Sequence, residues 1–405
     1  MKSIREIYRI GNGPSSSHSM APRFAAQIFL EKHPDANAFQ VVLYGSLAAT
    51  GKGHGTDVSI LAVLKKKGSV EIIWKPDIFL PFHPNGMTFR TIDKDKKITD
   101  EWTVYSIGGG TLAEEKKKYI EDADIYKMTR LKDILLWCSN TGKNYWEYVE
   151  KSEGIEIWDY LAEVWEKMKA SILQGLMTEG VLPGMLHLRR KASSFYIKSM
   201  GYRDTYKARG SVFAYALAAS EENAAGHIIV TAPTCGSCGV LPAVLFYLQK
   251  TRNFSDIRIY RALATAGLIG NIVKENASVS GAEVGCQGEI GVACAMASAA
   301  SCQLFGNSIT QVEYAAEMGL EHHLGMTCDP IGGLVQIPCI ERNAYAAARA
   351  LDINVYASFT DGNHYVSFDR VVEVMKKTGH DIPSLYKETS EGGLAKEFSC
   401  RKCKL

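Results

Sequence analysis

Three cysteines in the second half of this 405-residue chain lie in sequence contexts that suit an inorganic cluster. They are Cys286 in SGAEVGCQGEIG, Cys328 in LGMTCDPIGG and Cys339 in VQIPCIERN. Glycine or proline lies close to each one, so the backbone can approach a bulky group without an intervening Cβ. Cysteine thiolates hold iron–sulfur clusters, and a cluster with three such ligands leaves one iron free to act as a Lewis acid.

Inert buried thiols and a zinc site are the alternatives to a cluster. Free cysteine is among the most buried residue types, and we adopt that interpretation for Cys138, Cys294 and Cys302, which lie in apolar helical segments. Structural zinc sites usually take closely paired ligands, whereas the three candidates are separated by 42 and 11 residues. Spacing alone leaves zinc open.

One Cys-x-x-Cys pair, Cys235 and Cys238, lies in TAPTCGSCGVLPAVL, where we expect a helix to begin. Such a pair suits a redox dithiol or half of a zinc site. The other pair with this spacing is Cys400 and Cys403 at the end of the sequence. For Cys235 and Cys238 we therefore favour packing, or lining of the site, over a metal role.

Composition points to a small-molecule partner. The chain is long enough for two domains, and 46 basic against 44 acidic residues give a net charge of +2. So small a charge attracts neither nucleic acid nor an anionic membrane. The N-terminus has no signal-peptide pattern, and no apolar run reaches membrane-spanning length. We expect a cytoplasmic protein, in which ten cysteines do not form a disulfide framework.

The first domain, residues 1–155, is expected to be α+β. Helical spacing occurs at 19–32 and 56–66, and a charged stretch from 115 to 150 indicates a surface helix and connector. Extended segments rich in β-branched and aromatic residues occur at 39–45, 77–84, 87–93 and 102–110.

The second domain, residues 156–405, is expected to be mostly α-helical. Its run GVACAMASAASCQLF is apolar almost all round, which predicts a central helix buried on every side. Helical segments are predicted near 157–177, 206–223, 239–250, 256–275, 288–305, 309–324 and 340–351.

Along nearly its whole length the chain resembles the iron–sulfur-dependent L-serine dehydratases. The matching stretches, in the family's order, are GPSSSH, GSLAATGKGHGTD, LPFHPNGM, TEGVLPG, EENAAG, TAPT, KENASVSGAEVGCQGE, EHHLGMTCDPIGGLVQIPCIERN and SEGGLA. The resemblance implies an α+β domain, similar to a regulatory domain of some phosphoglycerate dehydrogenases, followed by a helical catalytic domain. It also implies a homodimeric lyase of L-serine catabolism and gluconeogenesis that forms pyruvate and ammonia without pyridoxal phosphate.

The resemblance makes Cys286, Cys328 and Cys339 the ligands of a [4Fe–4S] cluster. It gives Cys400 the role of a tail residue that caps the fourth iron in the resting enzyme. The sequence departs from the family pattern in two places. RKCKL extends beyond Cys400 and supplies Cys403 as a second candidate, and TCGSCG replaces an Asn-Gly-Ala type of sequence.

Three histidines on expected loops of the first domain are candidates for the proton transfer that elimination from serine requires. We assign His54, in GKGHGTD, as the general base with Asp57 as its orienting partner. His18, in PSSSH, is assigned to substrate binding or proton relay, and His83, in PFHPNG, to substrate binding. The alternative for each is a structural histidine paired with a backbone carbonyl. The site is expected at the domain interface.

The remaining substrate contacts are assigned to polar residues near these motifs. A serine at 17 or 19 is expected to cap the helix that begins near Pro22, which leaves the other hydroxyls to hold a carboxylate. The residues assigned to these contacts are Ser15, Ser16, Ser17, Asn85, Lys274 and Asn276. The alternatives for the last two are a surface lysine and a helix-capping asparagine.

Two other functions stay open. The thiols at 235 and 238 keep β-elimination from cysteine as a candidate, and threonine is a further possible substrate. A protein that binds zinc or a cluster without catalysis, and whose first domain senses an amino acid, is the alternative from another class.

Overall fold

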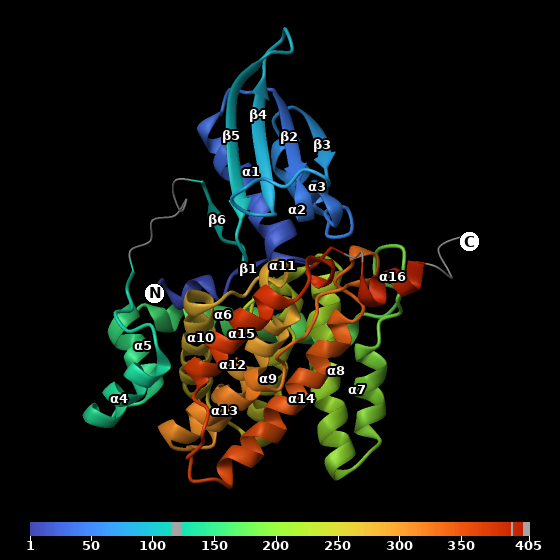
Figure 1. The fold of residues 1–405 in the computed structure, drawn as a ribbon. Helices are drawn as coiled ribbons and strands as arrows, with labels where there is room; N and C mark the ends of the chain where they lie inside the picture. The colour runs from blue at the N-terminus through green and yellow to red at the C-terminus, as the bar shows by residue number, and fades with distance from the viewer. Residues whose placement is uncertain (116–123, 390–391, 400–405) are drawn as a thin grey trace.

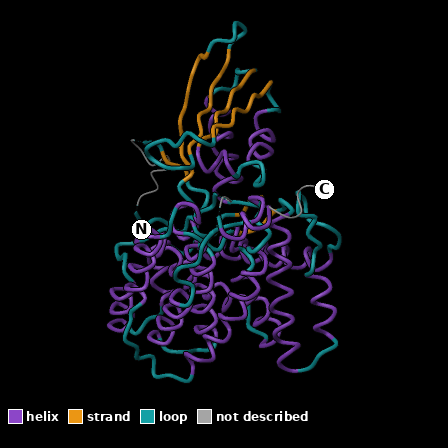
Figure 2. Tube along the Cα trace, turned by 45° about the vertical axis from the view of Figure 1, so that its right-hand side comes forward, coloured by secondary structure: helices purple, strands orange, loops and turns teal. Residues whose placement is uncertain are grey.

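The computed structural model describes residues 1–115, 124–389 and 392–399. A sheet-containing domain stands on a larger helical domain (Figure 1), and nearly all strands belong to the former (Figure 2). The predicted succession of an α+β domain and a mostly helical domain is confirmed.

The first domain is built on a five-stranded mixed sheet with the strand order β3-β2-β4-β5-β6. Strands β2 and β3 are parallel, and the other neighbours are antiparallel. Phe29, Phe39 and Phe89 lie in its apolar core. The strands are β2 (Ala38–Tyr44), β3 (Ser69–Lys75), β4 (Gly86–Ile92), β5 (Ile98–Ser106) and β6 (Leu112–Ala113), and the helices are α1 (Ala21–Lys32), α2 (Gly45–Ala49) and α3 (Thr56–Leu64).

Three of the four predicted extended segments lie in strands β2, β4 and β5, and the fourth is wrong. Residues 77–84 form a loop, because Pro81 and Pro84 have no N–H to donate to a sheet. Strand β3 was not predicted from the sequence. Every one of its residues is exposed or only half-buried, so it has no buried apolar face to mark it.

The helical domain is organised around α12 (Ile290–Leu304). Every residue of this helix except Gln303 is buried, as predicted, and Cys294 and Cys302 are among them. Its alanines, serines and glycine let the neighbouring helices approach closely. The other helices are α4 (Leu131–Thr141), α5 (Tyr145–Glu153), α6 (Ile157–Met177), α7 (Ala192–Met200), α8 (Asp204–Ala224), α9 (Val240–Arg252), α10 (Asp256–Asn276), α11 (Gly281–Val284), α13 (Ile309–Glu321), α14 (Cys339–Ser358), α15 (Phe368–Asp381) and α16 (Gly393–Ser399).

Several segments of the predicted first domain, residues 1–155, pack into the core of the helical domain. Ile134 of α4, Val149 of α5 and the N-terminal Ile4 belong to it, and Cys138 is buried there as predicted. Part of the stretch predicted as a surface helix and connector, 116–123, lies outside the described residues. The boundary after residue 155 stays a prediction.

The N-terminal segment ties the two domains together. Strand β1 (Ile10–Asn12) pairs antiparallel with β7 (Ile228–Val230) of the helical domain. The chain then runs directly into the PSSSH stretch, which therefore lies where the two domains meet. Within the described residues, no helix has both the length and the apolar character needed to cross a membrane.

Candidate active site

The three cysteines singled out from the sequence lie at three helix starts or loops of the helical domain. Cys286 begins a 3₁₀ turn (Cys286–Gly288) directly after α11, and Cys339 begins α14. Cys328 precedes a second 3₁₀ turn, Ile331–Gly333. All three thiols are buried. Helix α11 marks this place in Figure 1, at the end of the helical domain beneath the sheet domain.

Two of these thiols form a tight group with a carboxylate. The Sγ atoms of Cys286 and Cys328 and a carboxylate oxygen of Glu289 all lie within 4.8 Å of one another. Cys339 is not a member of this group, but its thiol is close enough to interact electrostatically with Cys286. The three candidate ligands, separated by up to 53 positions in sequence, therefore converge in the fold.

The donor set fits a metal cluster. Contact with Cys286, together with burial, holds the pKa of Cys328 well above its usual range. Burial and then Cys286 do the same to the pKa of Cys339. Thiols crowded in this way are stabilised as thiolates when a metal binds them. Gly281 leaves space beside them, because a Cβ at this position would lie only 3.3 Å from Cys328 Sγ.

Two glutamates that the sequence analysis did not identify face this group. Glu289 accepts a hydrogen bond from Thr234 Oγ1 at 2.7 Å, and burial followed by the charge of Glu388 raises its pKa to about 7. Burial, and then Cys286, raise the pKa of Glu388 to about 8. Glu289 follows Cys286 by three residues, so this spacing could have identified it as a site residue from the sequence.

Glu388 reaches the site because the backbone segment at 386–388 pairs with Cys328, although the two are about 60 residues apart in sequence. The N–H of Cys328 donates to the carbonyl of Tyr386 at 2.8 Å, and the N–H of Glu388 donates to the carbonyl of Cys328 at 2.8 Å. From the first domain, Ser46 Oγ donates to the Glu388 carbonyl at 3.3 Å. Both domains thus fix this glutamate.

His18 and His54 form a buried pair next to Glu388. Their ring centroids lie 4.5 Å apart, and both side chains are fully buried. His18 Nδ1 lies 3.7 Å from a carboxylate oxygen of Glu388. Its Nε2 lies 3.0 Å from Thr50 Oγ1. Burial, and next the neighbouring His54, hold the pKa of His18 well below its usual range.

The hydrogen bonds of His54 define which nitrogen is basic. Its Nδ1 lies 3.1 Å from the carbonyl of Thr50, which can only accept a hydrogen bond, so Nδ1 carries the proton. Burial lowers the pKa of the ring to about 4, so it is neutral near pH 7. Nε2 then holds a lone pair, and it has no hydrogen-bond partner among the described residues. The orienting group is Thr50, not the expected Asp57.

His83 and Asn85 border the same interface from the sheet domain. His83 Nδ1 accepts from the backbone N–H of Asn85 at 3.1 Å, and Nε2 lies 3.4 Å from Glu283 Oε1 of α11. The side-chain amide of Asn85 is buried, and neither of its polar atoms has a partner within the described part of the chain. Such a group is available to a ligand.

Comparison with known families covers almost the whole chain. The family model of the serine dehydratase beta chain matches residues 3–70 and 63–117, and that of the serine dehydratase alpha chain matches residues 103–395. The chain belongs to the serine dehydratase family. Both parts of the family are fused here in one polypeptide.

Individual relatives agree over their full length. The chain is 38% identical to an L-serine dehydratase of Haemophilus influenzae, over 99% of this chain and 100% of the relative. It is 39% identical to an L-serine dehydratase of Streptomyces coelicolor, over 97% and 98%. L-serine dehydratase 1 of Escherichia coli is 38% identical, over 99% and 100%. The chain is accordingly an enzyme of the lyase class.

The PSSSH stretch forms a short π-helical turn, Ser16–Met20, ahead of α1. The expectation that Ser17 or Ser19 caps the helix is wrong. Ser15 Oγ accepts from the backbone N–H of His18 at 3.1 Å, and Ser19 Oγ donates to the carbonyl of His54 at 2.7 Å. Ser16 and Ser17 are buried, and their hydroxyls make no hydrogen bond to other described residues.

Lys274 and Asn276, both on α10, line different cavities. Lys274 forms an ion pair with Glu6 and lines a cavity of about 290 Å³ that His83 and Glu283 also line. The Asn276 amide donates to the carbonyl of Thr129 at 2.7 Å and lines a different cavity. The structure therefore brings Lys274, but not Asn276, to the side of the interface that holds His83.

The remaining cysteines divide into packed thiols and residues outside the description. Cys235 and Cys238 are buried in a small cluster with Met20, and Cys235 Sγ lies 3.8 Å from Met20 Sδ. Their contacts agree with the expected packing role. The tail candidates Cys400 and Cys403 lie outside the described residues.

Proposed function

We propose that this chain eliminates water from L-serine, giving pyruvate and ammonia, with a [4Fe–4S] cluster held by Cys286, Cys328 and Cys339. One observation carries the proposal: three buried thiols converge beside Glu388, which in turn contacts a neutral histidine pair from the other domain. The names of the full-length relatives support the same substrate. When bound, the cluster supplies a Lewis acid for the departing hydroxyl group.

His54 is the base in this proposal. Its Nε2 has the free lone pair, and its Nδ1 proton is held by the Thr50 carbonyl, so the ring is oriented and neutral before substrate arrives. Nε2 removes the proton from Cα of serine. His18, between His54 and the Glu388 carboxylate, can relay that proton towards Glu388.

The polar groups around this base bind the rest of the substrate. Ser15, Ser16 and Ser17 hold the carboxylate of serine, and the unpaired amide of Asn85 adds a donor from the sheet domain. Glu388 faces the same space and accepts hydrogen bonds from the ammonium group. His83 closes this wall by its contact with Glu283, and Lys274 extends it towards the 290 Å³ cavity.

Further parts of the proposal follow from family membership rather than from contacts. We propose that the enzyme is cytoplasmic, acts in L-serine catabolism that supplies gluconeogenesis, needs no pyridoxal phosphate and assembles as a homodimer. Asn276 retains only an indirect role, because its side chain holds two backbone carbonyls.

A substrate comparison with isotope labelling tests the proposal. Anaerobically prepared enzyme should release pyruvate from L-serine and show slower turnover on serine deuterated at Cα, because His54 removes that hydrogen. L-threonine and L-cysteine should react at least tenfold more slowly in kcat/KM. Faster sulfide release from L-cysteine, or no pyruvate from L-serine, would contradict it.

A further inference from the structure

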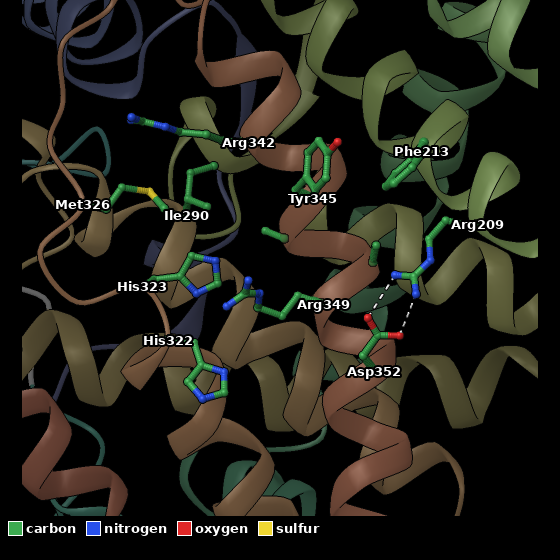
Figure 3. Close-up of a pocket in the computed structure, with 12 residues that line it drawn as sticks. Arg209, Phe213, Ile290, His322, His323, Met326, Arg342, Tyr345, Arg349 and Asp352 are labelled. Atoms are coloured by element: carbon green, nitrogen blue, oxygen red, sulfur yellow. Dashed lines mark hydrogen bonds and ion pairs between the residues drawn. The ribbon is translucent and has the colours of Figure 1, made fainter. Parts of the chain in front are cut away.

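A further cavity lies among the helices of the helical domain. Its volume is about 450 Å³, and helices α8, α13 and α14 surround it (Figure 3). That volume falls within the range of small-molecule sites. Neither the cysteine ligands nor the first-domain histidines line it.

One face of α14 supplies most of the polar lining. Arg342, Tyr345, Arg349 and Asp352 follow one another at spacings of three, four and three residues, which places them on one side of the helix. Figure 3 shows the Arg349 side chain directed towards His323, which follows α13. The cavity therefore has a charged stripe on one wall and the end of α13 on the other.

The charges of the lining residues do not cancel. Arg209 of α8 and Asp352 form a two-point ion pair, with both N–O distances 3.0 Å, so they neutralise each other. Arg349 forms no ion pair within the described part of the chain. Burial lowers the pKa of His323 to about 4, so this ring adds no charge at neutral pH. Arg349 therefore brings a positive charge that no carboxylate of the described residues neutralises, and Arg342 brings a second guanidinium that it shares with Asp329 and Cys286.

Apolar side chains separate these two cations. Tyr345 stands between them on α14, and its ring centroid lies 5.4 Å from that of Phe213. Ile290 and Met326 complete this apolar middle. The Cα atoms of Arg342 and Arg349 are seven residues apart, about 10.5 Å along the helix axis, and both side chains are long enough to reach inward. A complementary ligand has an anion at each end and a short apolar centre.

Arg342 connects the cavity to the thiol group, where it interacts with Cys286, and also to the C-terminal helix. Its Nη1 donates to the Thr327 carbonyl at 2.7 Å, and its Nη2 lies 3.6 Å from Asp329 Oδ1. The other oxygen of Asp329 accepts from the N–H of Leu394 in α16 at 2.8 Å. Asp329 is thus shared between the cavity's arginine and the helix that follows Glu388.

From this arrangement we propose that the cavity binds a small aliphatic dicarboxylate, and that its binding loosens α16. One carboxylate pairs with Arg349, and the other draws Arg342 away from Asp329. Asp329 then loses the cation that helps to hold it against Leu394. The site goes beyond the elimination reaction and gives the enzyme a means of sensing a metabolite.

Calorimetric titration of the anaerobically prepared full-length protein with succinate tests the binding step. We expect saturable binding that is at least tenfold weaker for Arg349→Gln, because a charged hydrogen-bond partner is lost. Arg370→Gln, which removes an exposed arginine of α15, is the matched control and should bind like the parent protein. Propionate and inorganic phosphate should bind at least tenfold more weakly than succinate.

Several outcomes would overturn this assignment. Absence of binding up to 10 mM succinate, or equal affinity of the parent protein and Arg349→Gln, would show that no such site exists here. Equal affinity for phosphate would reduce it to a general anion site. Because binding is measured without turnover, each outcome can be told apart from a failure of the proposed serine chemistry.

Hydrogen–deuterium exchange tests the coupling to α16. Succinate should speed exchange in a peptide covering 392–399 in the parent protein and have no effect in Arg349→Gln. Unchanged or slower exchange at saturating succinate would contradict the loosening of α16.

Discussion

At the scale of single residues, burial and backbone contacts define the chemistry of a few side chains. His54 is basic at Nε2 because a carbonyl that can only accept occupies Nδ1, and because burial keeps the ring neutral. The sequence suggested this histidine through its flanking glycines but named Asp57 as its partner. Thr50, one helical turn earlier, provides the contact through its backbone, which side-chain types do not reveal.

Replacing the base should abolish most of the activity and leave binding intact. We expect His54→Gln to lower kcat about 10²- to 10⁴-fold with little change in KM, because general-base catalysis contributes about that much. Initial-rate kinetics of pyruvate release measure this. His33→Gln, which changes a histidine paired with Asp100 at the edge of the first domain, should retain parental kcat. A loss of less than tenfold for His54→Gln would assign the base elsewhere.

Replacing Glu388 should affect mainly substrate binding. Glu388→Gln keeps the shape of the side chain and removes the carboxylate, whose charged form the bound ammonium group favours over the protonated form of the free enzyme. We expect KM to rise roughly tenfold to a hundredfold, since a hydrogen bond to a charged group contributes about 1.5–3 kcal/mol. Glu317→Gln, a buried glutamate of α13, is the control for loss of a carboxylate. An unchanged KM in Glu388→Gln would remove this glutamate from the ammonium site.

At the scale of elements, apolar patterns predicted most of the longer helices, but they missed α7 and α15 and did not indicate contacts between segments distant in sequence. Helix α6 was predicted with its bounds and α10 to within a residue, because apolar spacing and glycine or proline breaks mark their ends. The glycine and proline residues next to Cys286, Cys328 and Cys339 are also a local pattern, and they identified the thiol group. Glu388 was missed because only the pairing of residue 328 with the segment at 386–388 brings it to the site, and no local pattern encodes that return.

One loop contact should make stability depend on pH. His364 Nε2 lies 2.7 Å from Glu313 Oε2 of α13, and this hydrogen bond raises the pKa of His364 to about 9. The protonated form is favoured in the folded state, so its stabilisation is fully present below about pH 6.5 and is lost as pH rises through about 9. We expect it to contribute on the order of 1–3 kcal/mol at low pH.

Urea unfolding at two pH values measures this effect. His364→Asn should lower the unfolding midpoint relative to the parent protein at pH 6.5 and have much less effect at pH 10. His380→Asn, at an exposed position in α15, is the control and should match the parent protein at both. An equal destabilisation by His364→Asn at both pH values would show that the ion pair does not contribute.

At the scale of the whole molecule, the N-terminal segment unites the two domains. Tyr8 donates to the carbonyl of Leu263 in α10 at 2.7 Å, and the chain then pairs as β1 with β7 before it enters the PSSSH turn. The sequence predicted two domains and a site between them. It did not predict that the first residues pack into the helical core, because their short apolar pattern carries no information about a partner so distant in the chain.

Crowding this segment should therefore destabilise the helical domain. A Cβ at Gly267 would lie 2.8 Å from Tyr8 Cε2 and 3.1 Å from Ile4 Cβ. We expect Gly267→Ala to cost about 1–3 kcal/mol of unfolding free energy, as overpacking usually does. Thermal unfolding checks this, with Gly201→Ala as a control, because a Cβ there meets only a carbonyl at 3.4 Å. If Gly267→Ala is as stable as the parent protein, the N-terminal segment can shift to accommodate the added methyl group without a cost in stability.

Serine turnover should depend on a cluster held by Cys286, Cys328 and Cys339. The direct measurement is iron, sulfide and pyruvate formation on the same anaerobic samples. The parent protein and Cys302→Ser, a packed thiol of α12, should contain about four iron and four sulfide per chain and be active. Serine at any of the three positions should remove cluster and activity together. A colourless parent protein that still forms pyruvate from L-serine would contradict the account.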